Sequence, residues 1–267
     1  MVWLCQQKSY FWGLIDDLTK GMKKKLAGIL LLTGIFFTAF SQNEENKRSF
    51  SRPDIPGTFT LELGLNRGLE APEDFKLGLW GSRTINVYYS YNFRILNSRF
   101  SFVPGIGLSL ERFKFRSGHI LGYAGTGRDS VRLYGVSETN TAYPGLRKTQ
   151  LITNYIDVPL EIRYSTKPDD PARSFKISVG GRIGYMYDAF NKIKYKQDGE
   201  VKQIKDKQFH NLNRFRYGLM AKVGVGNLSL FGYYNISPLF KEGKGFYENG
   251  VANDFATTTI GISLAAF

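Results

Sequence analysis

The chain is poor in cysteine, in histidine and in long hydrophobic runs. Its 267 residues include one cysteine, Cys5, which excludes an intramolecular disulfide framework and a cysteine-based zinc site. No apolar run reaches the roughly 20 residues that a membrane-spanning helix requires. If the chain resides in a membrane, strands must therefore carry it there.

Aromatic residues and glycines are abundant instead. Phe, Tyr and Trp make up 15% of the sequence, and there are 29 glycines. This composition favours strands, interfacial aromatic rings and tight turns over helices. The apolar fraction of 42% is compatible with a membrane protein, because the strands of a membrane barrel alternate between apolar and polar residues.

The N-terminal region has the organisation of an export signal. Three basic residues, Lys23–Lys25, precede the apolar run Leu26–Phe40, and Ala39–Ser41 forms a small-x-small cleavage site. This order predicts a signal peptide over residues 22–41. Because the basic region begins at Met22, residues 1–21 are expected to be an extension from a mis-called start codon. The alternative is a cytoplasmic extension on a signal anchor.

Residues 42–56 are polar and contain two prolines, so we expect a periplasmic lead-in without regular structure. The segment that follows, 57–267, is predicted to form one barrel domain. Export by the signal peptide also excludes nucleic acid as a partner.

Alternating side chains between Tyr155 and Tyr187 indicate the fold. Ile156 and Val158 share one face of a strand over 155–164, and Asp157 and Glu161 share the other. A period of two is typical of a strand with one apolar and one polar side. Charges on the inner face suit a barrel that is apolar outside and polar inside.

The same alternation recurs along the chain. We expect strands at 58–66, 82–94, 99–115, 155–164, 175–187, 215–225, 228–236 and 256–267. Short turns at 96–98, 167–172 and 226–227 alternate with long, mobile connections at 67–81, 116–149, 193–213 and 237–255. Bacterial outer-membrane barrels have an even strand number and this alternation of connections. The sequence therefore predicts an all-β fold, an eight-stranded antiparallel up-and-down transmembrane β-barrel. A soluble lipocalin-like barrel is the competing fold, with its apolar side chains turned inward.

Charged side chains on the inward face are the candidate functional residues. The lumen of an eight-stranded barrel is only wide enough for side chains to fill it, so these charges should form ion pairs that plug it. The predicted network comprises Glu62, Arg94, Glu111, Asp157, Glu161, Arg163, Lys176, Arg182, Arg216 and Lys222. Carboxylates placed together can also serve as an acid–base pair, which is the alternative reading.

Two positions break the regular pattern. Pro159 removes a hydrogen-bond donor from its strand, so we expect a bulge or a local distortion there. Phe267 is a candidate signal for the barrel assembly machinery, but it is out of phase with Ile260, Ile262 and Leu264. A bulge near Ala265 or Ala266 would restore the phase.

The remaining polar residues offer weak evidence of other chemistry. His119 and His210 lie in or beside expected loops, where histidines are usually solvated, and the sequence predicts no catalytic, cofactor-binding or metal-binding residue. Basic residues of the long connections, such as Lys194 and Lys205, either contact lipopolysaccharide phosphates or form a solvated face.

A family resemblance rests on three motifs. The run Asn154–Arg163, the segment Gly180–Tyr185 and a last strand ending in Phe267 resemble the PorT-like outer-membrane β-barrel family of the Bacteroidota. The resemblance covers residues 57–267. It implies a barrel of the outer membrane, connected in some members to protein secretion or gliding.

These observations lead to three hypotheses of function. The first is a non-enzymatic barrel with a plugged lumen and a structural or assembly role, alongside a secretion apparatus as the resemblance implies. Its expected partners are outer-membrane lipid, lipopolysaccharide, the barrel assembly machinery and secretion components. The second is a loop-based enzyme that modifies lipid or cleaves protein. The third is transport of a small ligand.

Overall fold

The computed structural model describes residues 57–266 except 70, 72–74, 76, 79–80, 116–118, 126, 136–138, 140–141 and 249–250. The start extension, the signal peptide and the lead-in expected over residues 1–56 lie outside this part, and so does Phe267. Among the described residues, no helix has the length and apolar character needed to cross a membrane.

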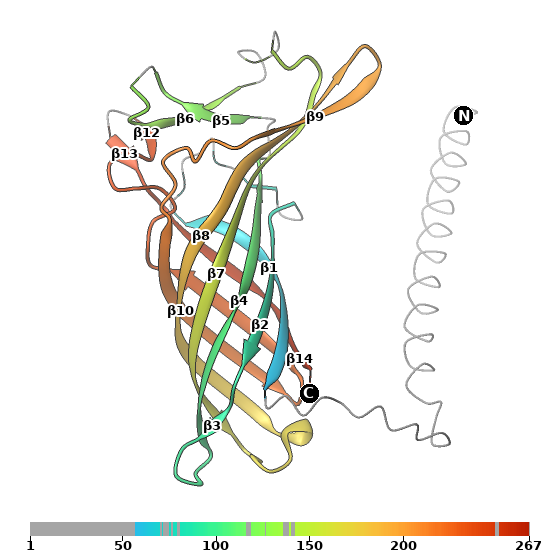
Figure 1. Ribbon diagram of the computed structural model, residues 1–267, viewed down its shortest axis with the longest axis vertical. Helices are drawn as coiled ribbons and strands as arrows, with labels where there is room; N and C mark the ends of the chain where they lie inside the picture. The colour runs from blue at the N-terminus through green and yellow to red at the C-terminus, as the bar shows by residue number, and fades with distance from the viewer. Residues whose placement is uncertain are drawn as a thin grey trace, which may run out of the picture. The chain divides into compact units, whose positions relative to one another are not determined.

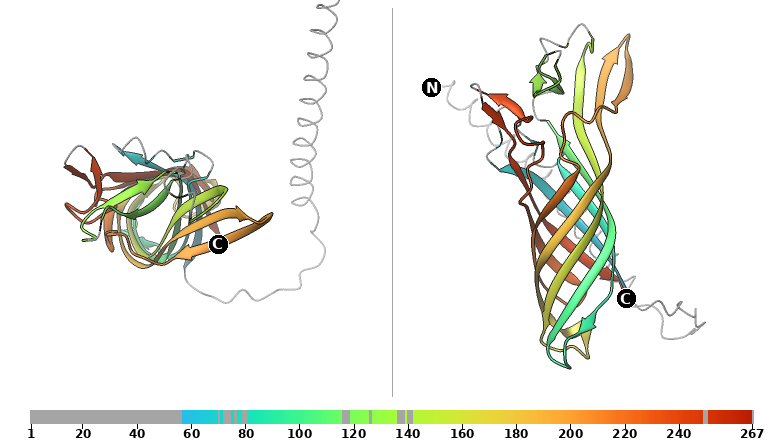
Figure 2. Two further views of the ribbon diagram at one scale, coloured as in Figure 1. Left: turned by 90° about the horizontal axis from the view of Figure 1, so that it is seen from above. Right: turned by 60° about the vertical axis from the view of Figure 1, so that its left-hand side comes forward.

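Eight strands form a closed antiparallel ring (Figures 1 and 2). In chain order they are β1 (Thr58–Leu69), β2 (Arg83–Ser90), β4 (Phe100–Lys114), β7 (Leu146–Ser165), β8 (Phe175–Gln197), β10 (Phe215–Val225), β11 (Leu228–Asn235) and β14 (Ala256–Ala266). Each strand pairs with its neighbours in the chain, and β1 closes the ring by pairing with β14. The prediction of an eight-stranded antiparallel up-and-down barrel is confirmed.

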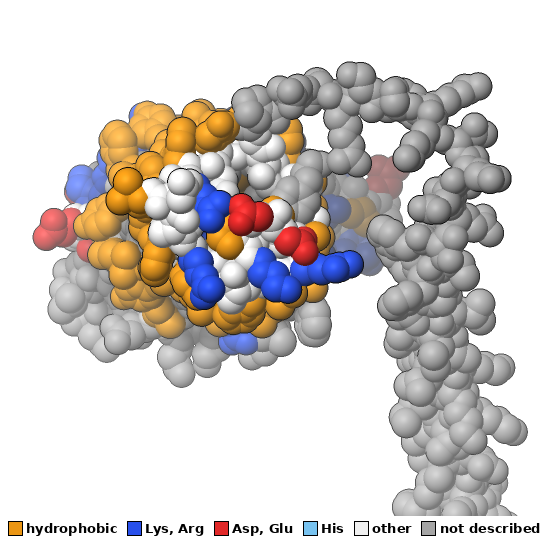
Figure 3. All heavy atoms as spheres, turned by 90° about the horizontal axis from the view of Figure 1, so that it is seen from below, with side chains coloured by type: hydrophobic (Ala, Val, Ile, Leu, Met, Phe, Trp, Pro, Cys, Tyr) orange, Lys and Arg blue, Asp and Glu red, His pale blue; other side chains and the backbone are white. Residues whose placement is uncertain are grey.

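Alternation along each strand determines which side chains face outward. Ile260 is 67% exposed and Val179 is 57% exposed on the outside, whereas Asp157 is fully buried in the lumen. Figure 3 shows hydrophobic side chains around the outer rim, with charged ones gathered at the mouth that the short turns surround. Apolar outside and polar inside is the arrangement of a membrane barrel, and the inverse of the lipocalin-like alternative.

Aromatic side chains border the outer apolar surface near the short turns. Phe100 and Tyr164 lie with their ring centroids 5.3 Å apart, and Tyr91 and Phe93 with theirs 4.5 Å apart. Interfacial aromatic girdles of this kind flank the apolar band of outer-membrane barrels. The short strand β3 (Phe93–Arg94) pairs with β4, and the turn between β7 and β8 contains the 3-10 helix η2 (Pro171–Arg173).

The two irregular positions differ: Pro159 lies at a local distortion without a bulge, and no bulge occurs in the described end of β14. Pro159 pairs with Arg182 in the regular register of β7 and β8, and the register shift in the span falls between Asn154 and Tyr155 instead. The missing amide hydrogen acts on the other side of β7, where the pairing with β4 is interrupted around Gly105. The pairing of β14 with β1 continues without a shift through Ala265.

The long connections contain more regular structure than the sequence predicts. Residues 193–213 were expected as a loop, but β8 continues to Gln197 and turns back as β9 (Glu200–Asp206). Alternation persists there because Ile193 and Tyr195 are buried against Ile120. The strands β5 (Ile120–Tyr123), β6 (Val131–Tyr134), β12 (Phe246–Glu248) and β13 (Val251–Asn253) form a second sheet from two separate connections, at the end marked by these labels in Figure 1.

An apolar cluster lies where the long connections meet the ring. It is formed by buried side chains of the long connections and of the adjoining strand ends, namely Phe75, Phe113, Phe115, Leu121, Val131, Leu133, Leu151, Tyr155, Met186, Ala189, Leu212, Leu239, Phe240, Phe246 and Phe255. We call it the apolar cap. Phe75 contacts Phe255 with a centroid distance of 4.5 Å, and Phe240 contacts Phe246 at 5.3 Å. Aromatic pairs at such distances pack favourably, so the long connections and the adjoining strand ends share one buried core.

Candidate functional site

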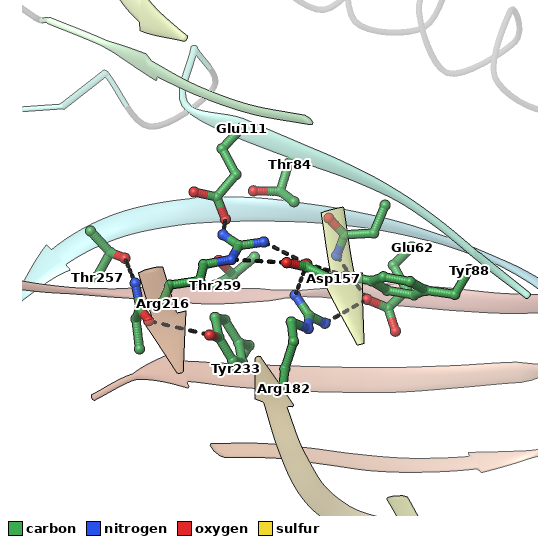
Figure 4. Close-up of polar contacts among 12 residues, drawn as sticks. Glu62, Thr84, Tyr88, Glu111, Asp157, Arg182, Arg216, Tyr233, Thr257 and Thr259 are labelled. Atoms are coloured by element: carbon green, nitrogen blue, oxygen red, sulfur yellow. Dashed lines mark hydrogen bonds and ion pairs between the residues drawn. The ribbon is translucent and has the colours of Figure 1, made fainter. Parts of the chain in front are cut away.

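The candidate site is a cluster of charged side chains on the inner wall of the ring (Figure 4). Each charge occupies an inward position of its strand, so the alternation that builds the apolar outside also places these groups in the lumen. The carboxylates are Glu62 on β1, Glu111 on β4, and Asp157 and Glu161 on β7, and the cations are Arg182 on β8 and Arg216 and Lys222 on β10. Water is excluded from nearly all of them.

Arg216 is the centre of the cluster. Its Nη2 lies 2.6 Å from Oδ2 of Asp157, and its Nη1 donates to Oε1 of Glu111 at the same distance. Its Nε also donates to Oδ1 of Asp157 at 3.2 Å. The guanidinium carbon stands 3.7 Å from the ring centre of Tyr155. The planar fork of arginine therefore joins two carboxylates that lie on different strands.

Arg182 forms the second junction. Its Nη2 donates to Oε2 of Glu62 at 3.1 Å, and its Nη1 lies 3.9 Å from Oδ2 of Asp157. The guanidinium also faces the rings of Tyr233, at 4.3 Å, and Tyr88, at 5.1 Å. The Tyr88 hydroxyl donates to Oδ2 of Asp157 at 2.9 Å. Asp157 thus accepts hydrogen bonds from Arg216 and Tyr88 and forms a longer ion pair with Arg182.

Lys222 completes the cluster toward the short turns. Its ammonium lies 2.7 Å from Oε1 of Glu62 and 2.7 Å from Oε1 of Glu161. Asn86 donates to the other oxygen of Glu62 at 2.8 Å. Charges buried in this way are tolerated when they are paired and hydrogen-bonded.

Three of the ten predicted network residues lie outside this cluster. Arg163 approaches Glu161 at 3.6 Å and remains partly exposed. Lys176 donates to the carbonyl oxygen of Gly226 at 2.9 Å, at the mouth near the short turns. Arg94, on β3, pairs with the exposed Asp169 at 2.7 Å. It lies opposite Ser101 at the mouth near the short turns, and its partner belongs to the turn between β7 and β8 rather than to the cluster.

Charge in the cluster is close to balanced. Four carboxylates face Arg182, Arg216 and Lys222, with Arg163 close to Glu161. Each of the four carboxylates has a cation at 2.6–2.7 Å, so the arrangement favours ion pairing over acid–base chemistry. Among the described residues, no group of three or more Asp, Glu, His and Cys side chains could hold a metal ion.

Aromatic and polar partners of the cluster were not among the predicted site residues. Tyr88, Tyr155 and Tyr233 all point inward and are buried. The phase of each strand is the signal that identifies them, since Tyr233 shares its face with the polar residues of its strand. A second hydrogen-bond group beside the arginines joins three strands, as Asn66 on β1 accepts from Thr84 on β2 and from Thr259 on β14.

The two histidines differ in environment. His210 is buried, its Nδ1 lies 2.7 Å from the carbonyl oxygen of Gln208, and its ring stacks on Tyr123 at 5.2 Å. The expectation of a solvated loop residue is wrong for His210, because the β8–β9 hairpin and β5 enclose it. Burial lowers the pKa of His210, against smaller opposing effects of Gln208 and Asp206. His119 is partly exposed, and its carbonyl oxygen accepts from Thr149.

The sequence of residues 33–241 matches the family described as outer membrane protein beta-barrel domain. The chain belongs to the outer membrane β-barrel domain family. This membership assigns the barrel to the outer membrane and gives it a lipid environment. In outer-membrane barrels the long connections face the outside of the cell and the short turns face the periplasm.

Solved structures and curated proteins add little to this assignment. The attachment invasion locus protein Ail of Yersinia pestis has 13% sequence identity and a TM-score of 0.32, with 79% of this chain and 97% of that chain covered. The same protein in complex with the heparin analogue sucrose octasulfate has 11% identity and a TM-score of 0.29, covering 79% and 100%. No curated protein matches the chain in sequence.

Proposed function

We propose that this outer-membrane barrel is a non-conducting protein with a plugged lumen and a structural or assembly role, alongside a protein-secretion apparatus. The observation that carries the proposal is the burial of paired charged side chains inside the ring. Arg182 and Arg216 are buried among four carboxylates, and the apolar cap lies beyond them toward the outside. A barrel filled in this way offers no continuous water path, so a porin or transport function is disfavoured.

Single-channel recording in planar bilayers tests the plug. The native protein is expected to give no stable conductance. A matched variant carrying Asp157→Ala and Arg216→Ala removes both members of one ion pair and creates space in the lumen, so it serves as the control that pores of this size are detected. Steady conductance of the native barrel would refute the plugged lumen.

The role alongside secretion is drawn from the resemblance to PorT-like proteins of the Bacteroidota. Affinity isolation of the tagged protein from crosslinked native outer membranes tests it. Recovery of secretion components supports the role, and recovery of the barrel with lipid alone contradicts it.

Mass spectrometry of the same material measures the N-terminus, which we propose lies at Gln42 after removal of the signal peptide 22–41. Deletion of Phe267, with folded barrel as the readout, tests that residue as an assembly signal.

We propose that the chain is not an enzyme. The burial of His210 between Gln208 and Tyr123 supports this, since a general base must reach its substrate. The variants His119→Ala and His210→Ala, expressed in cells lacking the native protein, are expected to leave the lipid and peptide profile of the outer membrane unchanged. The loop-based enzyme would be favoured if either substitution changed the lipid and peptide profile of the outer membrane while substitution of another loop residue did not.

A further inference from the structure

A patch of cations lies on the outward face of the barrel, toward the long connections. On β4 the outward series continues from Leu108 and Leu110 into Arg112 and Lys114, so the apolar surface gives way directly to positive charge. The patch, which we call the basic belt, comprises Arg83 on β2, Arg112 and Lys114 on β4, Lys148 on β7, Lys192 and Lys194 on β8, and Lys205 on β9. It therefore crosses five neighbouring strands.

Several members of the basic belt face one another directly. The strand register places Arg83 opposite Arg112. It also places Lys148 opposite Lys194, and Lys192 opposite Lys205. Like charges at directly opposed positions destabilise a sheet. The three like-charge pairs therefore add no stability to the folded barrel by themselves.

Carboxylates of the described residues do not form ion pairs with the belt. Asp188, an outward carboxylate lower on β8, instead accepts from Asn154. The positive charges therefore repel one another, and a bound anion would relieve that repulsion.

An apolar groove runs below one end of the belt. It has a volume of about 600 Å³, and Leu63, Leu65, Ile85, Ile260 and Ile262 line it. Arg83 stands at its upper end and belongs to the belt. A ligand that occupies both features must carry an anionic group and a hydrocarbon chain.

We propose that the basic belt and this groove bind a phosphate-bearing lipid of the outer leaflet, with its phosphate on the belt and an acyl chain in the groove. The inference rests on the outer-membrane location stated above and names the residues that make the contact. The belt borders the apolar surface on the side of the long connections, so a bilayer that covers this surface would bring its lipid headgroups to the belt. Lysine and arginine stems extend along such a boundary with their charged ends toward phosphate.

Native mass spectrometry of the full-length mature barrel in neutral detergent, with diphosphoryl lipid A as the probe, tests the proposal. The belt variant carries Lys114→Gln, Lys148→Gln and Lys192→Gln. The control variant carries three exposed lysines of the long connections changed in the same way, Lys202→Gln, Lys207→Gln and Lys241→Gln. Each cation near an anionic lipid surface contributes roughly fivefold in affinity, so the belt variant should lose on the order of a hundredfold. The control variant should lose less than about fivefold.

Three results would overturn the proposal. The first is that the native protein retains diphosphoryl lipid A and its dephosphorylated form equally. The second is that the belt and control variants lose the same amount of lipid affinity. The third is that the protein binds a soluble sulfated polysaccharide in preference to the lipid. A third variant with arginine at the same three belt positions is expected to retain the lipid, which separates charge from misfolding. Conductance is an independent readout, so a conducting barrel that still binds the phosphorylated lipid refutes the plugged lumen alone.

Discussion

Replacement of Asp157 by Asn is the most direct test of the lumen cluster. The substitution keeps the size of the side chain and removes its charge, which leaves Arg216 with Glu111 and Arg182 with Glu62. Breaking a fully buried ion pair by neutralising one partner costs about 3–5 kcal/mol, because the remaining charge stays buried. With a urea dependence of about 2–3 kcal/mol per molar, the unfolding midpoint should fall by about 1–2 M.

Equilibrium urea unfolding of the refolded barrel in detergent micelles measures this effect. Asp169→Asn is the matched control, since Asp169 forms an ion pair of similar length with Arg94 at an exposed turn. Exposed pairs contribute little, so the midpoint of the control should barely move. Equal midpoint shifts for Asp157→Asn and Asp169→Asn would refute the assignment of a buried, energetically coupled cluster.

A double-mutant cycle isolates the pair itself. Asp157→Asn and Arg216→Gln are each expected to destabilise the barrel, and the double variant should lose less than the sum by at least about 1 kcal/mol. Additive losses would mean that the 2.6 Å contact between the two side chains does not contribute as a pair.

Three further predictions concern packing and the outer connections. Gly184→Ala should destabilise the barrel by about 1–3 kcal/mol, because the added Cβ would clash with Oδ1 of Asp157. Gly232→Ala is the control and should be near neutral in the same urea assay, because no atom lies within 4 Å of its added Cβ. Phe240→Ala should cost about 3–5 kcal/mol of local stability in the apolar cap, measured as faster protease cleavage of the long connections with the barrel strands still protected. For His210, a folded-state pKa below the ordinary value of 6.5 means that stability is complete above pH 6.5 and decreases as pH falls through 6.5 toward the folded-state pKa. Cleavage near the β8–β9 hairpin should therefore accelerate at low pH, and a pH response that persists in the His210→Phe variant would contradict this cause.

The sequence by itself determined which side chains face the lumen. In a strand the direction of a side chain depends only on its position, so the inward placement of Asp157, Arg182 and Arg216 could be read from alternation. The number of strands and the positions of the short turns followed from the same pattern. Phase also carried the information that Tyr233 points inward, although its role as a partner of Arg182 could not be deduced from it.

The tertiary structure decided which charges meet. Glu111 and Arg216 are separated by 105 residues, and Glu62 and Arg182 by 120, and these contacts exist only once the ring has closed with a particular register. Arg94 shows the limit of alternation, since its partner Asp169 lies in the turn between β7 and β8 and not among the lumen charges. The apolar cap, the buried His210 and the like-charge pairs of the basic belt have the same origin. Each depends on segments far apart in the chain lying side by side, and neither alternation nor composition specifies that pairing.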